Sequence, residues 1–279
     1  LLIVIFPALI VAAWFFDADA RHSGLIAAVF LLALVSWIDD RKHISPAMRF
    51  STHILAACLG SFSFVPNEVI FGESLPFWVD RTLMILGWTW FINLYNFMDG
   101  IDGITGVETV SIAVGISLVS ATTREMDPFS NLVLFILIGV SLGFLVFNWH
   151  PAKIFLGDIG SIPLGYLVGF CLLSLAVKGH LLAALILPLY YLADSSITLV
   201  KRLLRREKFW QAHRQHFYQR AALGAGTHSK IVILILIANT GLIAAAALSL
   251  SKEMLGVSGA VLIVGLLFER MQVLSKAKH

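Results

Sequence analysis

The organisation of this chain is decided by the stretch Asn93-Leu94-Tyr95-Asn96-Phe97-Met98-Asp99-Gly100-Ile101-Asp102-Gly103-Ile104-Thr105-Gly106. An apolar run from Leu83 to Phe97 ends there in two carboxylates, Asp99 and Asp102, three positions apart. On a helical continuation, positions i and i+3 share one face. The surrounding glycines let the backbone turn sharply or approach a ligand closely. The stretch therefore predicts two carboxylates facing one ligand where a buried helix meets water; the alternative is a solvated helix end with glycine caps.

Composition places the whole chain in a membrane. Of its 279 residues, 58% are hydrophobic and 13% are charged, whereas a soluble domain averages about 25% charged residues. A bilayer core needs about 20 apolar residues per helix. Ten candidate spans follow, at 1–16, 24–38, 49–65, 77–97, 107–122, 130–147, 160–177, 181–200, 230–249 and 255–269. We expect an all-α, polytopic integral membrane bundle of about ten transmembrane helices, forming a single membrane-embedded domain over 1–279.

Basic residues predict the orientation of these spans. Fifteen of the 20 Lys and Arg residues fall in the connections at 39–49, 98–106, 148–159, 201–230 and 270–279. Cytoplasmic loops carry the excess of Lys and Arg, so these connections are expected in the cytoplasm. The long connection 201–229 is then expected on the cytoplasmic side, where it would be accessible to soluble substrates. Leu1 already lies in an apolar run without a preceding Met, so a missing upstream span would bring the count to about eleven.

Further carboxylates lie on that same side. Asp39 and Asp40 close the second span, and Asp158 opens the seventh, joining Asp99 and Asp102. Five converging carboxylates would repel one another, and a divalent cation would relieve the repulsion. All-oxygen ligation suits Mg²⁺, or Mn²⁺ as the alternative, rather than zinc. An ordinary helix-end pair explains Asp39 and Asp40 alone, but it does not explain the whole set.

A basic segment, His213-Arg214-Gln215-His216-Phe217-Tyr218-Gln219-Arg220, has chemistry suited to an anionic substrate. Arg makes forked contacts to phosphate, and His can donate a hydrogen bond near neutral pH. No further Cys or His completes a zinc set around its two histidines. The alternative is a basic loop that meets anionic lipid, which suits the nearby Lys201 and Arg202 better.

These motifs resemble, in order, those of the polyprenyl-phosphate N-acetylhexosamine-1-phosphate transferases, which include the phospho-MurNAc-pentapeptide transferases of cell-wall synthesis. They are Asp39-Asp40, Asn93-x-x-Asn96-Phe97-Met98-Asp99-Gly100-Ile101-Asp102-Gly103, Phe155-Leu156-Gly157-Asp158-x-Gly160-Ser161 and His213-Arg214-x-His216-x-Tyr218-Gln219-Arg220. The resemblance implies a Mg²⁺-dependent enzyme with a cytoplasmic active site in the bacterial inner membrane. His-Arg-Gln-His replaces the triple-His run of the cell-wall branch, which favours the O-antigen-initiating branch. A Pro-x-Arg-Gly-Gly-Gly type motif, usual in the family, does not occur in this sequence.

The reaction implied is transfer of a HexNAc-1-phosphate from a UDP-sugar to undecaprenyl phosphate, with release of UMP. The sugar would be GlcNAc or a deoxy-HexNAc such as FucNAc or QuiNAc, and the product the first lipid-linked intermediate of O-antigen or another surface polysaccharide. Membrane lipids are further expected partners, nucleic acid is not, and a homodimer is one candidate assembly. The sugar, the polymer and the oligomeric state stay open.

Roles for individual residues follow from the same resemblance. The expected catalytic residues are Asp39, Asp40, Asp99 and Asp102, and the expected metal ligands are Asp158 and Asp99. The expected substrate-binding residues are Asn93, Asn96, Lys153, His213, Arg214, His216, Tyr218 and Arg220. Asp39 or Asp40 would orient or deprotonate the acceptor phosphate. A covalent aspartyl-phosphate route ranks second to direct displacement, and His53, Asp80 and Asp194 rank below the cytoplasmic carboxylates.

Two other classes of protein fit the composition. A cation-coupled transporter would hold its sites near the bilayer midplane on broken helices, whereas these acids fall at helix ends. A non-catalytic membrane scaffold would leave the acidic clusters without a role.

Overall fold

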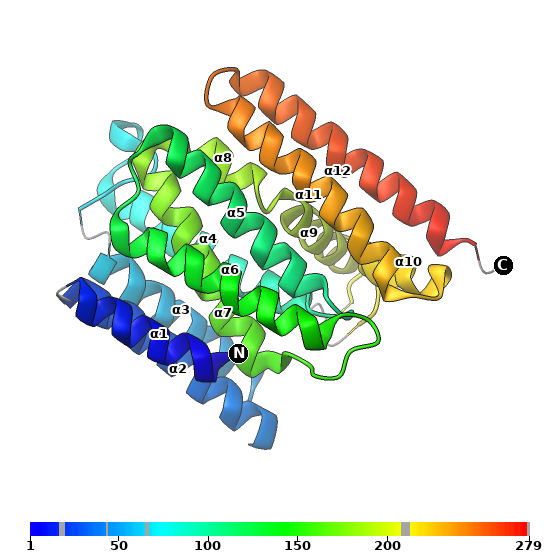
Figure 1. Cartoon of the computed structure of the whole chain (residues 1–279), viewed down its shortest axis with the longest axis horizontal. Helices are drawn as coiled ribbons and strands as arrows, with labels where there is room; N and C mark the ends of the chain where they lie inside the picture. Colours follow the sequence, from blue (N-terminus) through cyan, green and yellow to red (C-terminus); the bar gives the residue numbers. More distant parts are fainter. Residues whose placement is uncertain (17–19, 43, 65–66, 208–212, 278–279) are drawn as a thin grey trace.

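The computed structural model describes residues 1–16, 20–42, 44–64, 67–207 and 213–277, and all regular structure in these residues is helical (Figure 1). The helices are α1 (Leu2–Phe15), α2 (Ala20–Lys42), α3 (Pro46–Phe64), α4 (Phe77–Phe97), α5 (Ile104–Thr123), α6 (Pro128–Asn148), α7 (Gly157–Leu175), α8 (Leu181–Ile186), α9 (Leu189–Leu204), α10 (Phe217–Ala225), α11 (His228–Ser249) and α12 (Glu253–Ser275). A 3₁₀ turn, η1 (Gly72–Ser74), precedes α4, and a π turn, η2 (Ala176–His180), joins α7 to α8.

Six of the described helical segments are long and apolar enough to cross a membrane. They are His22–Lys42, Ile104–Thr123, Pro128–Asn148, Gly157–Ile186, His228–Ser249 and Glu253–Ser275. The chain is therefore a polytopic helical membrane protein, as expected, but the count of about ten spans is not supported. The predicted span 181–200 is split at Leu187 and Pro188 into α8 and α9. Proline has no N–H with which to continue the helix ladder, so the chain changes direction there.

Helix α7 lies at the centre of the bundle. It is buried along nearly its whole length, whereas most residues of α6, α11 and α12 are not fully buried. Its glycines admit large side chains of α4: a Cβ on Gly165 would clash with Tyr95, and one on Gly169 would clash with Trp88. Small residues at a helix interface let two helices approach closely inside a bilayer. The close approach brings the ends of α4 and α7 together, where the acidic residues stand.

The Trp88 indole fixes how α4 sits against α7. Its ring stacks on Tyr166 with centroids 4.5 Å apart and planes 12° from parallel. Its Nε1 donates a hydrogen bond to the Tyr166 carbonyl at 3.0 Å. Stacking and hydrogen bond together set both the distance and the register of the two helices.

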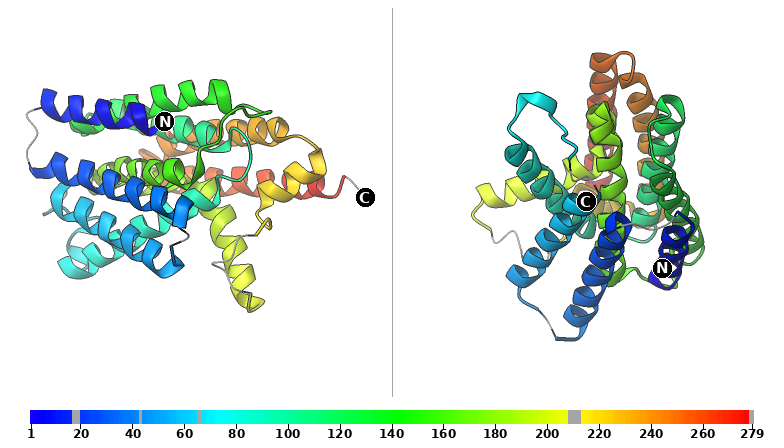
Figure 2. Two further views of the ribbon diagram at one scale, coloured as in Figure 1. Left: turned by 90° about the horizontal axis from the view of Figure 1, so that it is seen from below. Right: turned by 90° about the vertical axis from the view of Figure 1, so that its left-hand side faces the viewer.

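The connection 201–229 is more structured than the predicted loop. Helix α9 continues to Leu204, and residues 217–225 form α10, while 208–212 lie outside the described residues. Figure 2 shows α9 leaning out of the bundle and α10 returning against its end. The second half of the basic segment, from Phe217, therefore lies on a short helix that packs against α11 and α12.

We predict that Gly60→Ala destabilises the protein by about 1–3 kcal/mol, the usual effect of overpacking a core. A Cβ there would lie 2.3 Å from the Tyr166 hydroxyl and 2.4 Å from the Trp88 ring, inside the stack. Gly87→Ala is the matched control, since its Cβ would meet open space. Thermal unfolding in detergent should show a lower midpoint for Gly60→Ala alone; equal midpoints would contradict this account of the α4–α7 contact.

Candidate functional site

The loop of residues 98–103 joins α4 to α5 and is not helical. The predicted helical continuation through Asp99 and Asp102 is therefore wrong. Gly103 has φ +82°, a left-handed conformation that glycine adopts without steric cost, and it starts α5 in a new direction. As a consequence the two carboxylates do not share one face, and each has its own set of partners.

Asp158, at the start of α7, is linked to two other segments. The Asn96 amide donates to its Oδ1 at 2.9 Å and also to the Ser161 hydroxyl at 2.9 Å. Its Oδ2 lies 3.7 Å from the guanidinium of Arg49, which in turn lies 3.1 Å from Asp39 Oδ2. Asp39 Oδ1 accepts from the Ile44 backbone N–H at 2.6 Å.

Together these contacts bring side chains from α2, α3, α4 and α7 to one end of the bundle. We call Asp39, Asp40, Asp99 and Asp158 the carboxylate cluster. The sequence did not identify Arg49 as a site residue; it entered only as one of the positive charges that predict the orientation of the spans. The available signal was its place one turn inside the helix that follows the Asp39-Asp40 pair.

Negative charge accumulates in the carboxylate cluster. Asp40 is exposed, and the charges of Asp158 and Asp39 both act on it. Asp99 is half-buried and accepts a hydrogen bond from the Thr105 hydroxyl at 2.6 Å. Burial, with a further contribution from the charge of Asp158, raises the pKa of Asp99 to about 6, although the Thr105 hydrogen bond acts in the opposite direction.

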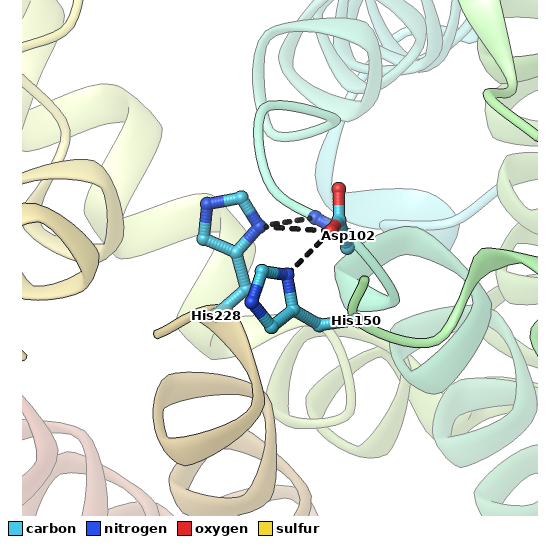
Figure 3. Close-up of side chains that lie close together, drawn as sticks. All are labelled: Asp102, His150 and His228. Atoms are coloured by element: carbon cyan, nitrogen blue, oxygen red, sulfur yellow. Dashed lines mark hydrogen bonds and ion pairs between the residues drawn. The ribbon is translucent and has the colours of Figure 1, made fainter. Parts of the chain in front are cut away.

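Asp102 forms a second group with two histidines that the sequence did not identify as site residues (Figure 3). Its Oδ2 lies 2.6 Å from His150 Nδ1 and 3.3 Å from His228 Nδ1, and it accepts from the Ala152 N–H at 3.1 Å. Partial burial works to raise the pKa of Asp102, but these hydrogen bonds outweigh it and lower the pKa below its usual value. Both histidines stand at helix boundaries, which is the signal that could have found them.

Among the described residues, one group of three metal-binding side chains has all donor atoms within 4.8 Å of one another, namely Asp102, His150 and His228. Two imidazoles and a carboxylate suit transition metals better than Mg²⁺. Asp158 and Asp99, the predicted metal ligands, do not belong to such a group. A Mg²⁺ site needs only one or two carboxylates, with water and phosphate oxygens completing it, so the prediction stays untested.

The basic segment sits beside the loop of residues 98–103. Arg214 and Arg220 are exposed, and His213 is half-buried with its ring stacked 4.9 Å from the ring of His216. Burial, with the neighbouring His216 and Arg202 charges adding to it, lowers the pKa of His213 to about 4. His216 and Tyr218 are instead buried, so both side chains pack inside the protein.

A pocket of about 440 Å³ lies between this segment and the loop of residues 98–103. Its lining residues are Gly100, Ile101, Arg214, Gln219, Ala222, Leu223, Gly226 and His228. Arg214 offers a positive charge and His228 an imidazole ring with hydrogen-bonding nitrogens, so the pocket suits an anionic group.

Two predicted substrate-binding residues lie apart from these contacts. Asn93 hydrogen-bonds the Thr89 carbonyl at 2.7 Å and the His53 ring at 3.1 Å, so it ties α4 to α3. Lys153 is exposed in the connection between α6 and α7, and its backbone N–H bonds to the Phe147 carbonyl at 2.8 Å.

We predict that Asp99→Asn stabilises the protein by roughly 1–3 kcal/mol at about pH 8, because it removes a charge that is poorly solvated in the folded state. Folding raises the pKa of this carboxyl from 3.8 to about 6. The penalty of the ionised form is therefore complete above about pH 6 and absent below about pH 4, where both states are protonated. Thermal unfolding of both proteins across this pH range should show midpoints that separate as pH rises; a constant difference would contradict the assignment.

The sequence of this chain is similar to those of several bacterial transferases. A probable undecaprenyl-phosphate N-acetylglucosaminyl 1-phosphate transferase of Bacillus subtilis (strain 168) is 25% identical over 232 residues, which are 78% of this chain and 63% of the relative. A phospho-N-acetylmuramoyl-pentapeptide-transferase of Streptococcus thermophilus (strain CNRZ 1066) is 28% identical over 197 residues, 66% of this chain and 57% of the relative. The same-named protein of Streptococcus pyogenes serotype M12 (strain MGAS2096) is 28% identical over 194 residues, 64% of this chain and 56% of the relative.

This chain thus spans less than two thirds of the length of the curated relatives it matches. The sequence profile of Glycosyl transferase family 4 matches residues 22–176, more than half of the chain and the part that contributes the carboxylate cluster, and so the chain belongs to Glycosyl transferase family 4.

Proposed function

We propose that this protein transfers a sugar 1-phosphate from a nucleotide-sugar donor to undecaprenyl phosphate. The observation that carries the proposal is the carboxylate cluster, which draws on α2, the loop of residues 98–103 and α7 and lies at the end of the bundle where the basic segment also docks. A site for this reaction must hold a diphosphate and a second phosphate, and must manage their combined charge. Of the three similar proteins named above, the Bacillus subtilis protein is named as a probable undecaprenyl-phosphate N-acetylglucosaminyl 1-phosphate transferase, and the two streptococcal proteins as phospho-N-acetylmuramoyl-pentapeptide-transferases.

The proposed donor is a UDP-N-acetylhexosamine carrying GlcNAc or a deoxy-HexNAc, with UMP as the leaving product. The support is the His213-Arg214-Gln215-His216 run, which differs from the triple-His run of the muramoyl-pentapeptide branch. The product would be the first lipid-linked intermediate of O-antigen or another surface polysaccharide.

A divalent cation, Mg²⁺ or alternatively Mn²⁺, fits the carboxylate cluster by donor type. The cluster offers carboxylate oxygens only, and the repulsion between Asp99 and Asp158 contributes to the raised pKa of Asp99. Asp158 and Asp99 would hold the cation. When bound, Mg²⁺ would neutralise charge on the diphosphate oxygens.

The remaining residues would position the two phosphates. Arg49 supplies a guanidinium between Asp39 and Asp158, where it could receive a phosphate oxygen. Asp39 already accepts bonds from Ile44 and Arg49, whereas Asp40 beside it is exposed. We therefore assign Asp40 to orienting the acceptor phosphate, and Asp39 to orienting Arg49. His213, Arg214, Arg220 and Lys153 would contact the donor.

Direct displacement is the simplest chemical route. The second pKa of a phosphomonoester is about 6, so the acceptor is largely dianionic near neutral pH and needs no covalent enzyme intermediate. Its oxygen attacks the sugar-linked phosphorus, a new P–O bond forms, and the bond to UMP breaks. The polyprenyl chain would lie in the membrane, next to the exposed apolar side chains of Val200, Leu203 and Leu204 at the cytoplasmic end of α9.

We place the protein in the bacterial inner membrane with the site facing the cytoplasm, where nucleotide sugars occur. The support is the excess of Lys and Arg in the connections at this end of the bundle. A homodimer is compatible with the apolar surfaces of α11 and α12, which remain exposed in the single chain.

The proposal predicts that the purified full chain releases UMP from a UDP-HexNAc only when undecaprenyl phosphate is present. A panel of UDP-GlcNAc and UDP-deoxy-HexNAc donors, with UDP-MurNAc-pentapeptide for comparison, identifies the sugar. Absence of acceptor-dependent UMP release from every donor would refute the reaction. A burst of about one UMP per enzyme without acceptor would replace direct displacement by the covalent route.

A second prediction concerns the cation. Asp158→Asn should lower turnover about 100-fold or more and remove most of its dependence on Mg²⁺, because a carboxylate that would hold the cation is lost, and with it the charge that would neutralise the diphosphate oxygens. Asp127→Asn is the matched control: Asp127 caps α6 by accepting from the Ser130 N–H, at the end of α5 and α6 away from the loop of residues 98–103. If Asp158→Asn kept a normal Mg²⁺ response, Asp158 would no longer be a candidate ligand.

A further inference from the structure

Asp194, on α9, is a fully buried carboxylate without a role in the reaction described so far. Its two oxygens are contacted by five groups: His216 Nδ1 at 3.1 Å, the backbone N–H groups of Phe217 at 3.0 Å and Tyr218 at 3.2 Å, and the hydroxyls of Thr198 at 3.3 Å and Tyr190 at 3.4 Å. A buried carboxylate is tolerated only where donors satisfy it in this way. The sequence ranked Asp194 below the other acids because it lies inside an apolar span.

Three of these five groups belong to the basic segment. The N–H groups of the first turn of a helix have no partner within the helix, and a carboxylate there also meets the positive end of the helix dipole. Asp194 therefore fastens the start of α10 to α9. His216 completes the arrangement as the first residue before α10: its backbone N–H donates to the Gln219 side chain at 3.3 Å, and its own side chain accepts from the Gln219 backbone N–H.

The fastened helix in turn holds the loop that carries Asp99 and Asp102. The Tyr218 hydroxyl donates to the Phe97 carbonyl at 3.1 Å, at the end of α4. A Cβ on Gly100 would lie 2.2 Å from that hydroxyl, so glycine is needed there for close approach. On the other side, the His213 ring stacks on His216. Asp194 is thus connected, through two neighbouring residues, to both sides of the pocket that Arg214 and His228 line.

We propose that Asp194 is a positioning residue for the donor diphosphate. It sets His216 with a hydrogen on Nδ1 and holds α10, so that His213 and Arg214 stand opposite the loop of residues 98–103. The inference rests on the proposed transferase function, but the His216 contact that it requires can be measured without any reaction. A capping role alone would support folding and leave donor recognition unaffected, and this difference decides the test.

The test uses Asp194→Asn in the full chain, with Asp80→Asn as the matched control. Asp80 is equally buried and also accepts backbone N–H bonds, from Ile70 at 3.0 Å and Phe71 at 2.7 Å, in the segment before α4. An Asn at 194 presents a donor where the α10 N–H groups need an acceptor. Both variants should lower the thermal midpoint. Only Asp194→Asn should lower kcat/KM for the UDP-sugar per folded enzyme, on the order of 100-fold, since small misplacements of binding groups have effects of that size.

A double substitution tests whether the loss of kcat/KM in Asp194→Asn arises through His216 or through a general disturbance of the fold. If Asp194 acts through that ring, Asp194→Asn combined with His216→Gln should lose little more than His216→Gln alone. Equal losses of kcat/KM in Asp194→Asn and Asp80→Asn, or fully additive losses in the double variant, would overturn the proposal.

The wild-type protein provides a readout that needs neither activity nor a folded Asp194 variant. Nitrogen NMR of histidine-labelled protein, with His216 assigned by His216→Gln, should show a proton on Nδ1 of His216. An unprotonated Nδ1 would overturn the proposal even if Asp194→Asn fails to fold. If Nδ1 is protonated but no donor releases UMP, the contact stands and the transferase function fails.

Discussion

The hydrogen bond from the Asn96 amide to Asp158 joins the ends of the two helices on which the site depends. It can form only because α4 and α7 approach closely, and that approach requires glycines on α7 against Trp88 and Tyr95. Apolar packing deep in the bundle thus sets the position of a polar contact at its end. A side chain added at either glycine would push apart residues that are several turns away.

Each acid at this end of the bundle is stabilised by a different means. Asp39 is paired with Arg49, Asp102 with two histidines, and Asp194 with the N-terminus of α10. Among the described residues, Asp99 has one side-chain hydrogen bond, from the Thr105 hydroxyl, and burial raises its pKa to about 6. Unequal compensation is typical of functional sites, where some charge is kept for a ligand to balance. Uncompensated charge lowers the free energy of unfolding, and packing elsewhere in the fold must offset that loss.

The sequence predicted an all-helical membrane fold, and the structure confirms it, because long apolar runs have few alternatives in a bilayer. It also predicted that Asp158 opens a helix, which is confirmed at Gly157. It could not predict that Pro188 splits a span, or that α10 forms within 201–229, because a short helix depends on a tertiary partner such as Asp194.

The contacts of the remaining site residues could not be predicted from the sequence for the same reason, because they too depend on tertiary packing. Arg49, His150 and His228 are separated in sequence from their carboxylate partners, and only the packing of helices brings them together. Asn96 hydrogen-bonds Asp158, whereas Asn93, three positions away, bonds to His53 on α3. The motif therefore identified candidate site residues, but it did not identify their contacts.

The contact between Gly100 and the Tyr218 hydroxyl has a consequence for how this chain can change over evolutionary time. The two positions are far apart in sequence, yet they occupy one volume. Substitution of Gly100 alone meets a steric block, and loss of Tyr218 alone leaves a void and an unpaired carbonyl at Phe97. Among homologous sequences, a side chain at position 100 should therefore accompany a smaller residue at position 218, so that the pair is inherited as one unit.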